Sequence, residues 1–448
     1  MRQKRTAQAS IYEQFADHAL GRELRAMSDW LDEHREVLDP VMRDLRRRGV
    51  RATGRTGLSA ESVLRCAVLK QHRQLSYDEL AFHLHDSASF QACARLPLHW
   101  CPSKSTLQHV IAALSPQTWE RVNRALITSA CEERFEPGKR VRIDSTATDA
   151  PIHPPSDSHL LWDAVRVMTR LLESAREWSE APTPSFVNHS RVAKKRARAI
   201  WYTRGANKRR PLYRDLLAVT RITLDNLDTY ARRVATSAIS GSGHETWLSQ
   251  VRYFKPLIEG VISQTERRVF GGETVPAKEK VLSLFEPHAD IIVKGARDVQ
   301  YGHKLNLVSG RSGLILDVVI EDGNPVDSQR FMPMLQRHEA HYGSMPRQVA
   351  ADGGYASPGN LHAAKAAGIE DVAFHKKRGL AINEMTRSPW VYRRLRNFRA
   401  GIEAGISCLK RAYGLSRCTW KGLQHFHAYV WSSTVAYNLS ILARHRLA

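Results

Sequence analysis

Residues 302–323 read GHKLNLVSGRSGLILDVVIEDG, two apolar or alternating runs separated by a short Gly/Ser turn. This pattern is typical of a β-hairpin. Further strand-like runs occur at 140–144, 290–295, 347–351 and 371–377, and helical periodicity fills much of the sequence between them. The order along the chain is strand, helical block, hairpin, helix, strand, helix, strand, helix. We therefore expect an α/β core that helices interrupt once.

Helix-start signals dominate the sequence before the first strand. Ser59 is expected to be the N-cap of a helix in LSAESVLRCAVLKQHR. Ser76 and Glu79 form a capping-box pattern in SYDELAFHLH. Ser105 and Gln108 repeat that pattern in STLQHVIAAL. These signals predict three short amphipathic helices.

We divide the chain into a helical N-terminal domain (1–135) and an α/β domain (136–448), with a helical insertion (158–285) inside the second. The short N-terminal helices fit a helix-turn-helix-like DNA-binding module, and a plain helical bundle fits the same pattern. Basic clusters at 46–48 and 51–55 favour the DNA-binding interpretation.

The net charge of the chain indicates which kinds of molecule it can bind. The chain has 67 Lys and Arg against 45 Asp and Glu, a net charge of +22. A field of that sign favours polyanions, either nucleic acid or an anionic membrane surface. No run approaches the roughly 18 apolar residues of a membrane-spanning helix. The start of the chain lacks an apolar signal region, and the six cysteines are dispersed without a CxxC pair. We expect a cytoplasmic protein that acts on nucleic acid, with no role at a membrane.

The basic charge is concentrated at 191–214, which holds ten basic residues and no acidic one. The basic side chains that we expect on the DNA backbone there are Lys194, Lys195, Arg196, Arg198, Lys208, Arg209 and Arg210. A solvated surface without a ligand fits the same run. Trp201 and Tyr202 lie within it and are candidates either for stacking on exposed bases or for packing in a helical core.

Three carboxylates are candidates for catalysis. Asp144 and Asp352 are each predicted at the carboxyl end of a strand, the sheet edge where active sites of open α/β sheets gather. Metal-dependent chemistry on phosphodiesters needs two or three converging carboxylates that hold two Mg²⁺ ions about 4 Å apart. Glu403 is the one acidic residue between Met385 and the end of the chain, against eleven Lys and Arg. A helix places Arg399, Glu403 and Lys410 on one stripe, which suits a metal ligand beside phosphate-binding cations. A solvated, salt-bridged helix face has the same pattern.

These residues resemble the DDE transposases of bacterial insertion sequences, in the branch whose signature is Tyr-x2-Arg-x3-Glu-x6-Lys. Arg399, Glu403 and Lys410 are in register with that signature, and Arg396 stands where the family has Tyr. RVRIDST is similar to the family's first strand and AADGGYAS to its second-acid motif. The hairpin and the helical N-terminal segment are also similar, so the resemblance spans most of residues 55–445.

The resemblance implies an RNase H-like catalytic domain, a mixed sheet flanked by helices. Asp144 would lie on the first strand, Asp352 on the fourth and Glu403 on a later helix, all three as ligands of two Mg²⁺ ions, with Mn²⁺ as a possible substitute. Arg399, Lys410 and Arg396 would contact DNA. It implies cleavage at terminal inverted repeats, 3′-hydroxyl attack on target DNA, and a homodimer or higher oligomer associated with the bacterial nucleoid.

Two other classes of protein fit part of the pattern: a catalytically inactive DNA-binding regulator and an RNase H-like structure-specific nuclease. The regulator needs no acidic triad, and the nuclease would cut DNA without joining it. Other acids also compete for the site; they are Asp149, Asp157, Asp163, Asp322, Asp327, Glu370, Asp371 and Glu384. Among them, Asp327 is most simply a helix cap. The His pairs at 83/85, 338/341 and 425/427 lack matched partners for a metal.

Overall fold

The structure is a computed structural model that describes residues 3–4, 15–47, 57–97, 100–178, 183–236, 242–294 and 298–448. The basic cluster expected at 51–55, with Arg48, lies outside the described residues. Contacts divide the chain into two compact units. The mixed unit comprises Met1–Pro151 and Ile292–Ala448, and the helical unit comprises Ile152–Ile291. Within the described residues, no helix has an apolar stretch long enough to cross a membrane.

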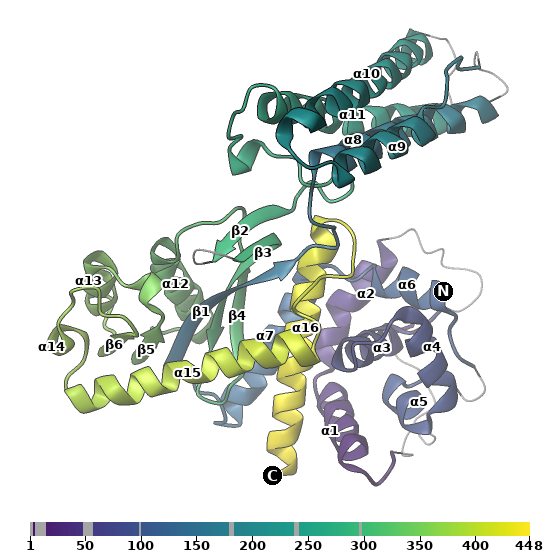
Figure 1. The fold of residues 1–448 in the computed structure, drawn as a ribbon. Coiled ribbons are helices and arrows are strands. Elements are labelled where there is room, and N and C mark those ends of the chain that lie inside the picture. Colours follow the sequence, from purple (N-terminus) through teal and green to yellow (C-terminus); the bar gives the residue numbers. More distant parts are fainter. Residues whose placement is uncertain are drawn as a thin grey trace. The chain divides into compact units, whose positions relative to one another are not determined.

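One mixed sheet forms the centre of the mixed unit (Figure 1). Its strands are β1 (Arg140–Asp149), β2 (Asp290–Lys294), β3 (Asp298–Ser309), β4 (Ile315–Ile320), β5 (Gln348–Ala351) and β6 (Asp371–Phe374). The strands β3, β1, β5 and β6 follow one another in space, and β2 and β4 both pair with β3. The predicted hairpin is confirmed, because β3 and β4 pair antiparallel on either side of the 310–314 turn. β1, β5 and β6 are parallel.

Helices cover this sheet and form most of the described chain before β1. They are α1 (Ala19–Glu33), α2 (Leu38–Arg46), α3 (Ala60–His72), α4 (Tyr77–Asp86), α5 (Ala88–Ala94), α6 (Lys104–Ile111), α7 (Pro116–Glu132), α12 (Phe331–Tyr342), α13 (Pro358–Ala366), α14 (Ile382–Met385), α15 (Pro389–Ala412) and α16 (Leu423–Leu447). The long helix α15 contacts β1, β5 and β6, whereas α7, α12 and α16 contact β4. Short 3-10 turns lie at 35–37, 327–330 and 353–355.

Helix α16 joins the N-terminal helices to the sheet. It is apolar around most of its circumference and almost wholly buried, as expected of a helix with protein on every side. It contacts α1, α3 and α7 as well as β4. The amide of Asn438 donates to the side chain of Asn123 on α7 and to the backbone of Ile315 on β4. The N-terminal helices and the α/β fold therefore share one hydrophobic core.

The capping signals are mostly found as expected. Ser59 caps α3, and Ser76 with Glu79 forms a complete capping box on α4. The prediction for Ser105 was wrong: α6 begins two residues earlier, and Ser103 accepts from the backbone N–H of Thr106. Ser103 directly follows Pro102, and its extended backbone suits an N-cap.

The helical unit contains α8 (Asp157–Ser174), α9 (Ser190–Tyr202), α10 (Ala206–Thr236) and α11 (Ser242–Val269), with 3-10 turns at 175–177 and 277–279. These helices have a hydrophobic core of their own. On α9, Ala193, Ala197 and Ile200 recur at spacings of four and three and are buried, so the remaining faces of that helix carry its basic residues.

Candidate active site

The parallel pairing of β1 and β5 places two of the candidate acids side by side. Ile143 lies opposite Ala351 in the register, so Asp144 and Asp352 are the next residues on the two neighbouring strands. Asp352 follows β5 directly and so lies at the carboxyl end of a strand, as expected. The expectation that this is the fourth strand was wrong, because β2 precedes the hairpin and makes β5 the fifth of the described strands. The expectation that the first strand ends at Asp144 was wrong, because β1 continues to Asp149. Antiparallel pairing with β3 along this whole stretch keeps it extended.

The turn after Asp352 requires glycine for reasons of space. A Cβ at Gly353 would lie 2.6 Å from the Cβ of Lys376, and one at Gly354 would lie 2.7 Å from a carboxylate oxygen of Asp327. Both contacts are far closer than packed atoms allow. The Gly-Gly sequence thus lets the chain turn tightly behind Asp352, in contact with the segments on either side.

Helix α15 brings the third candidate acid to the same place. Arg142 on β1 donates from Nη1 to the backbone oxygen of Phe398 at 2.9 Å, and its guanidinium lies over the Phe398 ring. A Cβ at Gly401 would overlap this guanidinium. The helix therefore approaches the strand closely enough for Arg399 and Glu403 to reach the acids of the sheet.

Arg399 forms the centre of the site. Its Nη2 atom lies 2.8 Å from Oδ2 of Asp144 and 3.5 Å from Oδ1 of Asp352. Its Nη1 atom lies 2.5 Å from Oε1 of Glu403. The Arg399 side chain is 10% exposed, against 13%, 39% and 60% for Asp144, Asp352 and Glu403. The structure thus gathers the three candidate acids around one guanidinium, and the side chain expected on DNA phosphates contacts carboxylates instead.

This arrangement bears on metal binding. Among the described residues, no three His, Cys, Asp or Glu side chains come close enough together to hold a metal ion as they stand. The three acids nevertheless converge on a cation, and their donors are all carboxylate oxygens, the ligands that Mg²⁺ and Mn²⁺ prefer. Three negative charges around one positive charge leave a net charge of −2 in this group. The donor set and its charge fit a divalent cation.

A buried polar network beneath the Asp352 turn was missed by the sequence interpretation. The hydroxyl of Tyr355 donates to Oδ1 of Asn306 at 2.6 Å, and the amide of Asn306 donates to Glu321 at 2.7 Å. Burial, together with the nearby carboxylates, raises the pKa of Tyr355 well above its usual range, so its hydroxyl stays a donor. Asp327 is not the helix cap that we expected; it forms an ion pair with the buried Lys304 at 2.6 Å. The sequence feature that could have indicated this ion pair is Lys304, a charged residue beside apolar residues of β3.

The other basic residues of α15 lie in different surroundings. Arg396 is exposed one turn before Arg399. Lys410 is half-buried, and its burial lowers its pKa, while Asp149 at the end of β1 opposes that shift. The regular stripe of Arg399, Glu403 and Lys410 is therefore divided by the fold: the first two residues meet at the candidate acids, and Lys410 forms no ion pair with any of the three.

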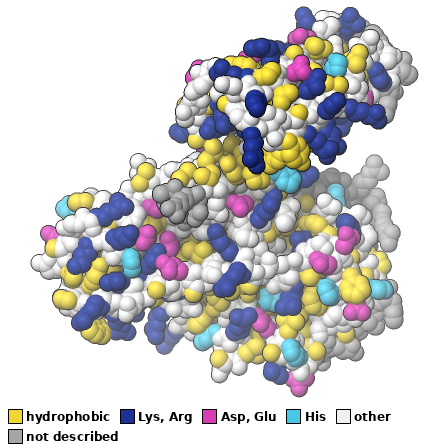
Figure 2. Space-filling model, in the orientation of Figure 1, with side chains coloured by type: hydrophobic (Ala, Val, Ile, Leu, Met, Phe, Trp, Pro, Cys, Tyr) yellow, Lys and Arg dark blue, Asp and Glu magenta, His cyan; other side chains and the backbone are white. Residues whose placement is uncertain are grey.

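The basic run of the helical unit is mostly open to solvent. Six of the seven residues expected on DNA are exposed; they are Lys194, Lys195, Arg198, Lys208, Arg209 and Arg210. Arg196 is half-buried and forms an ion pair with Asp215 at 2.7 Å. Trp201 and Tyr202 are 61% and 80% exposed, so packing in a helical core is excluded for both. Figure 2 shows Lys and Arg side chains over much of the visible face of this unit.

Two of the competing acids, Asp157 and Asp371, have partners away from the three candidates. Asp157 accepts from Arg268 and Gln264 within the helical unit. The buried Asp371 accepts from Gln348 and pairs with Arg387. None of the described acids other than the three candidates forms an ion pair with Arg399.

The strand order, with acids gathered beside the central parallel strands, defines an RNase H-like enzyme. Comparison with known families agrees with this class. Residues 294–439 match the family model described as "Transposase DDE domain", and residues 11–112 match one described as "Transposase domain". No curated protein and no solved structure matches the chain.

The chain is therefore a DDE transposase of the insertion-sequence type, an enzyme that cleaves DNA and transfers strands. The predicted family and the predicted RNase H-like fold are confirmed. Asp352 and Glu403 lie inside the matched DDE region, and Asp144 precedes it. The family acts on DNA and generally uses a divalent metal.

Proposed function

We propose that this transposase cleaves DNA at the terminal inverted repeats of a bacterial insertion sequence and joins the freed 3′-hydroxyl to target DNA. It would act in the cytoplasm, at the nucleoid, as a homodimer or higher oligomer that pairs two DNA ends. The observation that carries the proposal is the convergence of Asp144, Asp352 and Glu403 on the Arg399 guanidinium, with the parallel pairing of β1 and β5 placing the two aspartates side by side.

Asp144, Asp352 and Glu403 would hold the divalent metal, with Mg²⁺ as the physiological ion and Mn²⁺ as a substitute. The chemistry that a bound divalent metal would supply is activation of the attacking oxygen and stabilisation of the leaving oxygen of a phosphodiester. The protein would position these metal ligands. β1 and β5 fix the two aspartates relative to each other, and the hydrogen bond of Tyr355 holds the turn that follows Asp352.

Arg399 has two successive roles in this proposal. Before metal and DNA bind, its guanidinium neutralises part of the charge of the three acids and keeps them together. With the charge of the acids compensated by a bound metal, the guanidinium would be free to bind DNA phosphates, for which a planar, permanently charged group is well suited. The exposed Arg396, one turn earlier on α15, would contact the same backbone, and Lys410 would contact it beyond Glu403.

The basic face of the helical unit would bind the DNA backbone without reading its sequence. It offers the exposed basic side chains of α9 and the start of α10, together with the exposed rings of Trp201 and Tyr202. Such a surface gains affinity by releasing counterions, so binding through it should weaken steeply with salt. The rings would stack on bases at a distorted DNA end.

The test uses the purified protein with a plasmid that carries its gene and native flanks. Nicking and joining are followed with Mg²⁺, with EDTA, and in a Glu403→Gln variant. The matched control is Glu384→Gln, which changes an exposed glutamate outside the acid cluster. We expect Mg²⁺-dependent cleavage and joining at the flanks, lost in Glu403→Gln and retained in the control.

Three other outcomes contradict the proposal in different ways. Equal activity of the Glu403→Gln and control variants would remove Glu403 from the site. Cleavage without joining would indicate a nuclease of the same fold. DNA binding without cleavage by the unmodified protein would indicate a regulator.

A further inference from the structure

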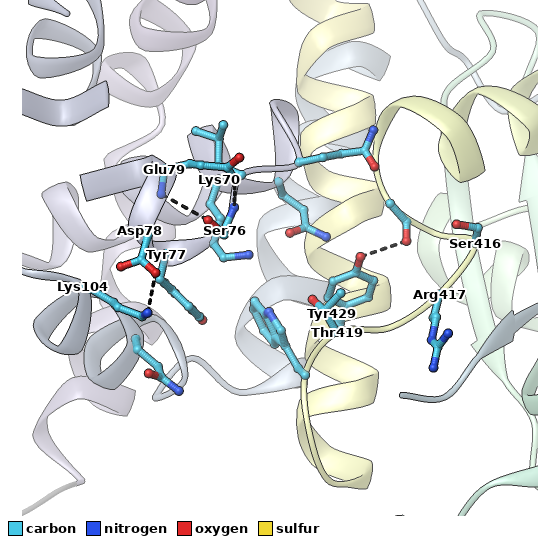
Figure 3. A pocket seen from close by; sticks show the side chains of 16 residues that line it. Lys70, Ser76, Tyr77, Asp78, Glu79, Lys104, Ser416, Arg417, Thr419 and Tyr429 are labelled. Carbon is cyan, nitrogen blue, oxygen red and sulfur yellow. Dashed lines mark hydrogen bonds and ion pairs between the residues drawn. The ribbon is translucent and has the colours of Figure 1, made fainter. Parts of the chain in front are cut away.

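A pocket of about 520 Å³ lies in the mixed unit, away from the candidate acids. One wall comes from α3, α4 and α6, and the other from the segment 414–420 and α16. Figure 3 shows Lys70, Ser76 and Tyr77 on one side and Thr419, Tyr429 and Arg417 on the other. The volume is in the range of small-ligand sites. A single nucleotide fits such a space and a double helix does not.

The unusual member of this pocket is Lys70. Its side chain is 5% exposed, and no described carboxylate forms an ion pair with it. The two acids of the lining are engaged elsewhere: Asp78 pairs with Lys104, and Glu79 accepts from the backbone N–H of Ser76 in the capping box. Burial lowers the pKa of Lys70 to about 8, against the weaker opposing effects of Cys418 and Glu79. The amine is still mostly charged at neutral pH.

Two aromatic rings lie near this ammonium group. Its Nζ lies 4.7 Å from the centre of the Tyr77 ring and 5.8 Å from that of Trp420. Tyr77 is half-buried, so part of its ring faces the pocket. Cation–π contacts replace only part of the hydration that a buried ammonium loses. A buried cation between aromatic walls therefore has the chemistry to bind a phosphate joined to an aromatic base.

The pocket is tethered to the strand that carries Asp144. Asp149, at the end of β1, donates its N–H to the backbone oxygen of Ser416 and accepts from the N–H of Cys418. Asp149 lies five positions after Asp144, a span of about 17 Å along a strand. That distance corresponds to about five nucleotides of one strand of B-form DNA. About this length of DNA strand would join the candidate acids to the segment that forms one wall of the pocket.

We infer that this pocket binds an unpaired nucleotide of the DNA substrate, with its phosphate at Lys70 and its base against Tyr77 and Trp420. The inference rests on the proposed function, because it takes the ligand from DNA. It adds a preference of the enzyme for DNA with an unpaired nucleotide near the cleavage site.

The experiment compares two fluorescent DNA probes by anisotropy at fixed salt: a paired duplex from the gene's flank, and the same duplex with a short single-stranded extension. Lys70→Met removes the charge and keeps an apolar side chain of similar length. Lys365→Met is the matched control, since Lys365 is also a partly buried lysine whose pKa is lowered by burial, but lies on α13 outside the pocket. A third arm adds free deoxythymidine monophosphate as competitor. A fourth places 5-iododeoxyuridine in the extension and maps photocrosslinks by mass spectrometry.

We expect the unmodified protein to bind the extended probe about tenfold more tightly than the paired duplex. A tenfold difference is the effect of one good hydrogen bond to a charged group. Lys70→Met should lose that preference and keep its affinity for the paired duplex, and Lys365→Met should retain both. Crosslinks should map to Tyr77 or Trp420. Thermal melting of Lys70→Met shows whether it is folded, and retained duplex binding shows it independently.

Equal binding of both probes by the unmodified protein, or an unchanged preference in Lys70→Met, would overturn the inference and leave the proposed function standing. Crosslinks that map only outside the pocket would overturn it as well. If free deoxythymidine monophosphate competes as strongly as the single-stranded extension does, the assignment of the ligand to DNA is overturned. Failure to bind either probe would overturn the proposed function together with the inference.

Discussion

Replacing Arg399 by glutamine tests whether its guanidinium holds the candidate acids together. The contact that matters most for stability is with Asp144, because both side chains are nearly buried, at 10% and 13% exposure. Removing one partner of a buried ion pair costs about 3–5 kcal/mol, since the other charge stays buried without compensation. The contact with Glu403, whose side chain is 60% exposed, contributes about 0–1 kcal/mol. We expect Arg399→Gln to lower the free energy of unfolding by about 3 kcal/mol in EDTA.

Divalent cations should reverse much of this loss. A ligand present at 100 times its Kd stabilises the folded state by about 2.7 kcal/mol. In the unmodified protein the cation must first displace Arg399 from Asp144, so part of that stabilisation is lost. Mg²⁺ or Mn²⁺ should therefore stabilise Arg399→Gln more than the unmodified protein, and Mn²⁺ should bind the variant more tightly in calorimetry without DNA.

The assay is urea unfolding followed by tryptophan fluorescence, in EDTA and in excess MgCl₂. Arg396→Gln, on the exposed side of the same helix, is the control and should change stability by no more than about 0.5 kcal/mol. The reasoning is refuted if the two variants are equally stable in EDTA, or if Mg²⁺ stabilises Arg399→Gln no more than the unmodified protein.

Three further predictions concern the parts of the chain around the site. Tyr355→Phe leaves the buried Oδ1 of Asn306 without its donor. We therefore expect the free energy of unfolding in urea to fall by about 1–3 kcal/mol and cleavage in the plasmid assay to be slower. Unchanged values in both assays would exclude a positioning role for Tyr355. Lys70→Met should be more stable at pH 7 by up to about 3 kcal/mol, because the pKa of Lys70 is about 8 when folded against an ordinary 10.5. Below pH 8 both states are protonated and the full cost of burial is present. Between pH 8 and 10.5 the unfolded state binds more protons than the folded state, so the unmodified protein gains stability as the pH rises. The difference in stability between Lys70→Met and the unmodified protein should therefore shrink over this range. A stability difference that does not change with pH would contradict this. Changing Lys194 and Lys195 together to glutamine should reduce the slope of log affinity against log salt by up to about 1.8 for duplex DNA, and an unchanged slope would place the DNA elsewhere.

Short-range patterns in the sequence were sufficient to predict many of the helices and strands of this protein. Alternation and the Gly/Ser turn predicted the β3–β4 hairpin, because strand period and turn chemistry are properties of a few neighbouring residues. Ser76 and Glu79 predicted the start of α4 for the same reason. The spacing of Arg399 and Glu403 predicted that they share one helix face, and the structure places them in contact.

Contacts between distant segments were decided by the tertiary structure alone. Asp144 lies 255 positions before Arg399, and no local pattern states that a guanidinium on α15 will meet it. The length of β1 was misjudged because strand β3, which keeps it extended past Asp144, joins it from more than 150 residues away. Lys70 is one of several polar residues in the sequence of α3, and only the packing of α3 against the segment around Trp420 buries its charge. Local chemistry thus determined the elements and the family, whereas the surroundings of each charged group depend on which segments pack together, since burial and ion pairing arise only when distant segments meet.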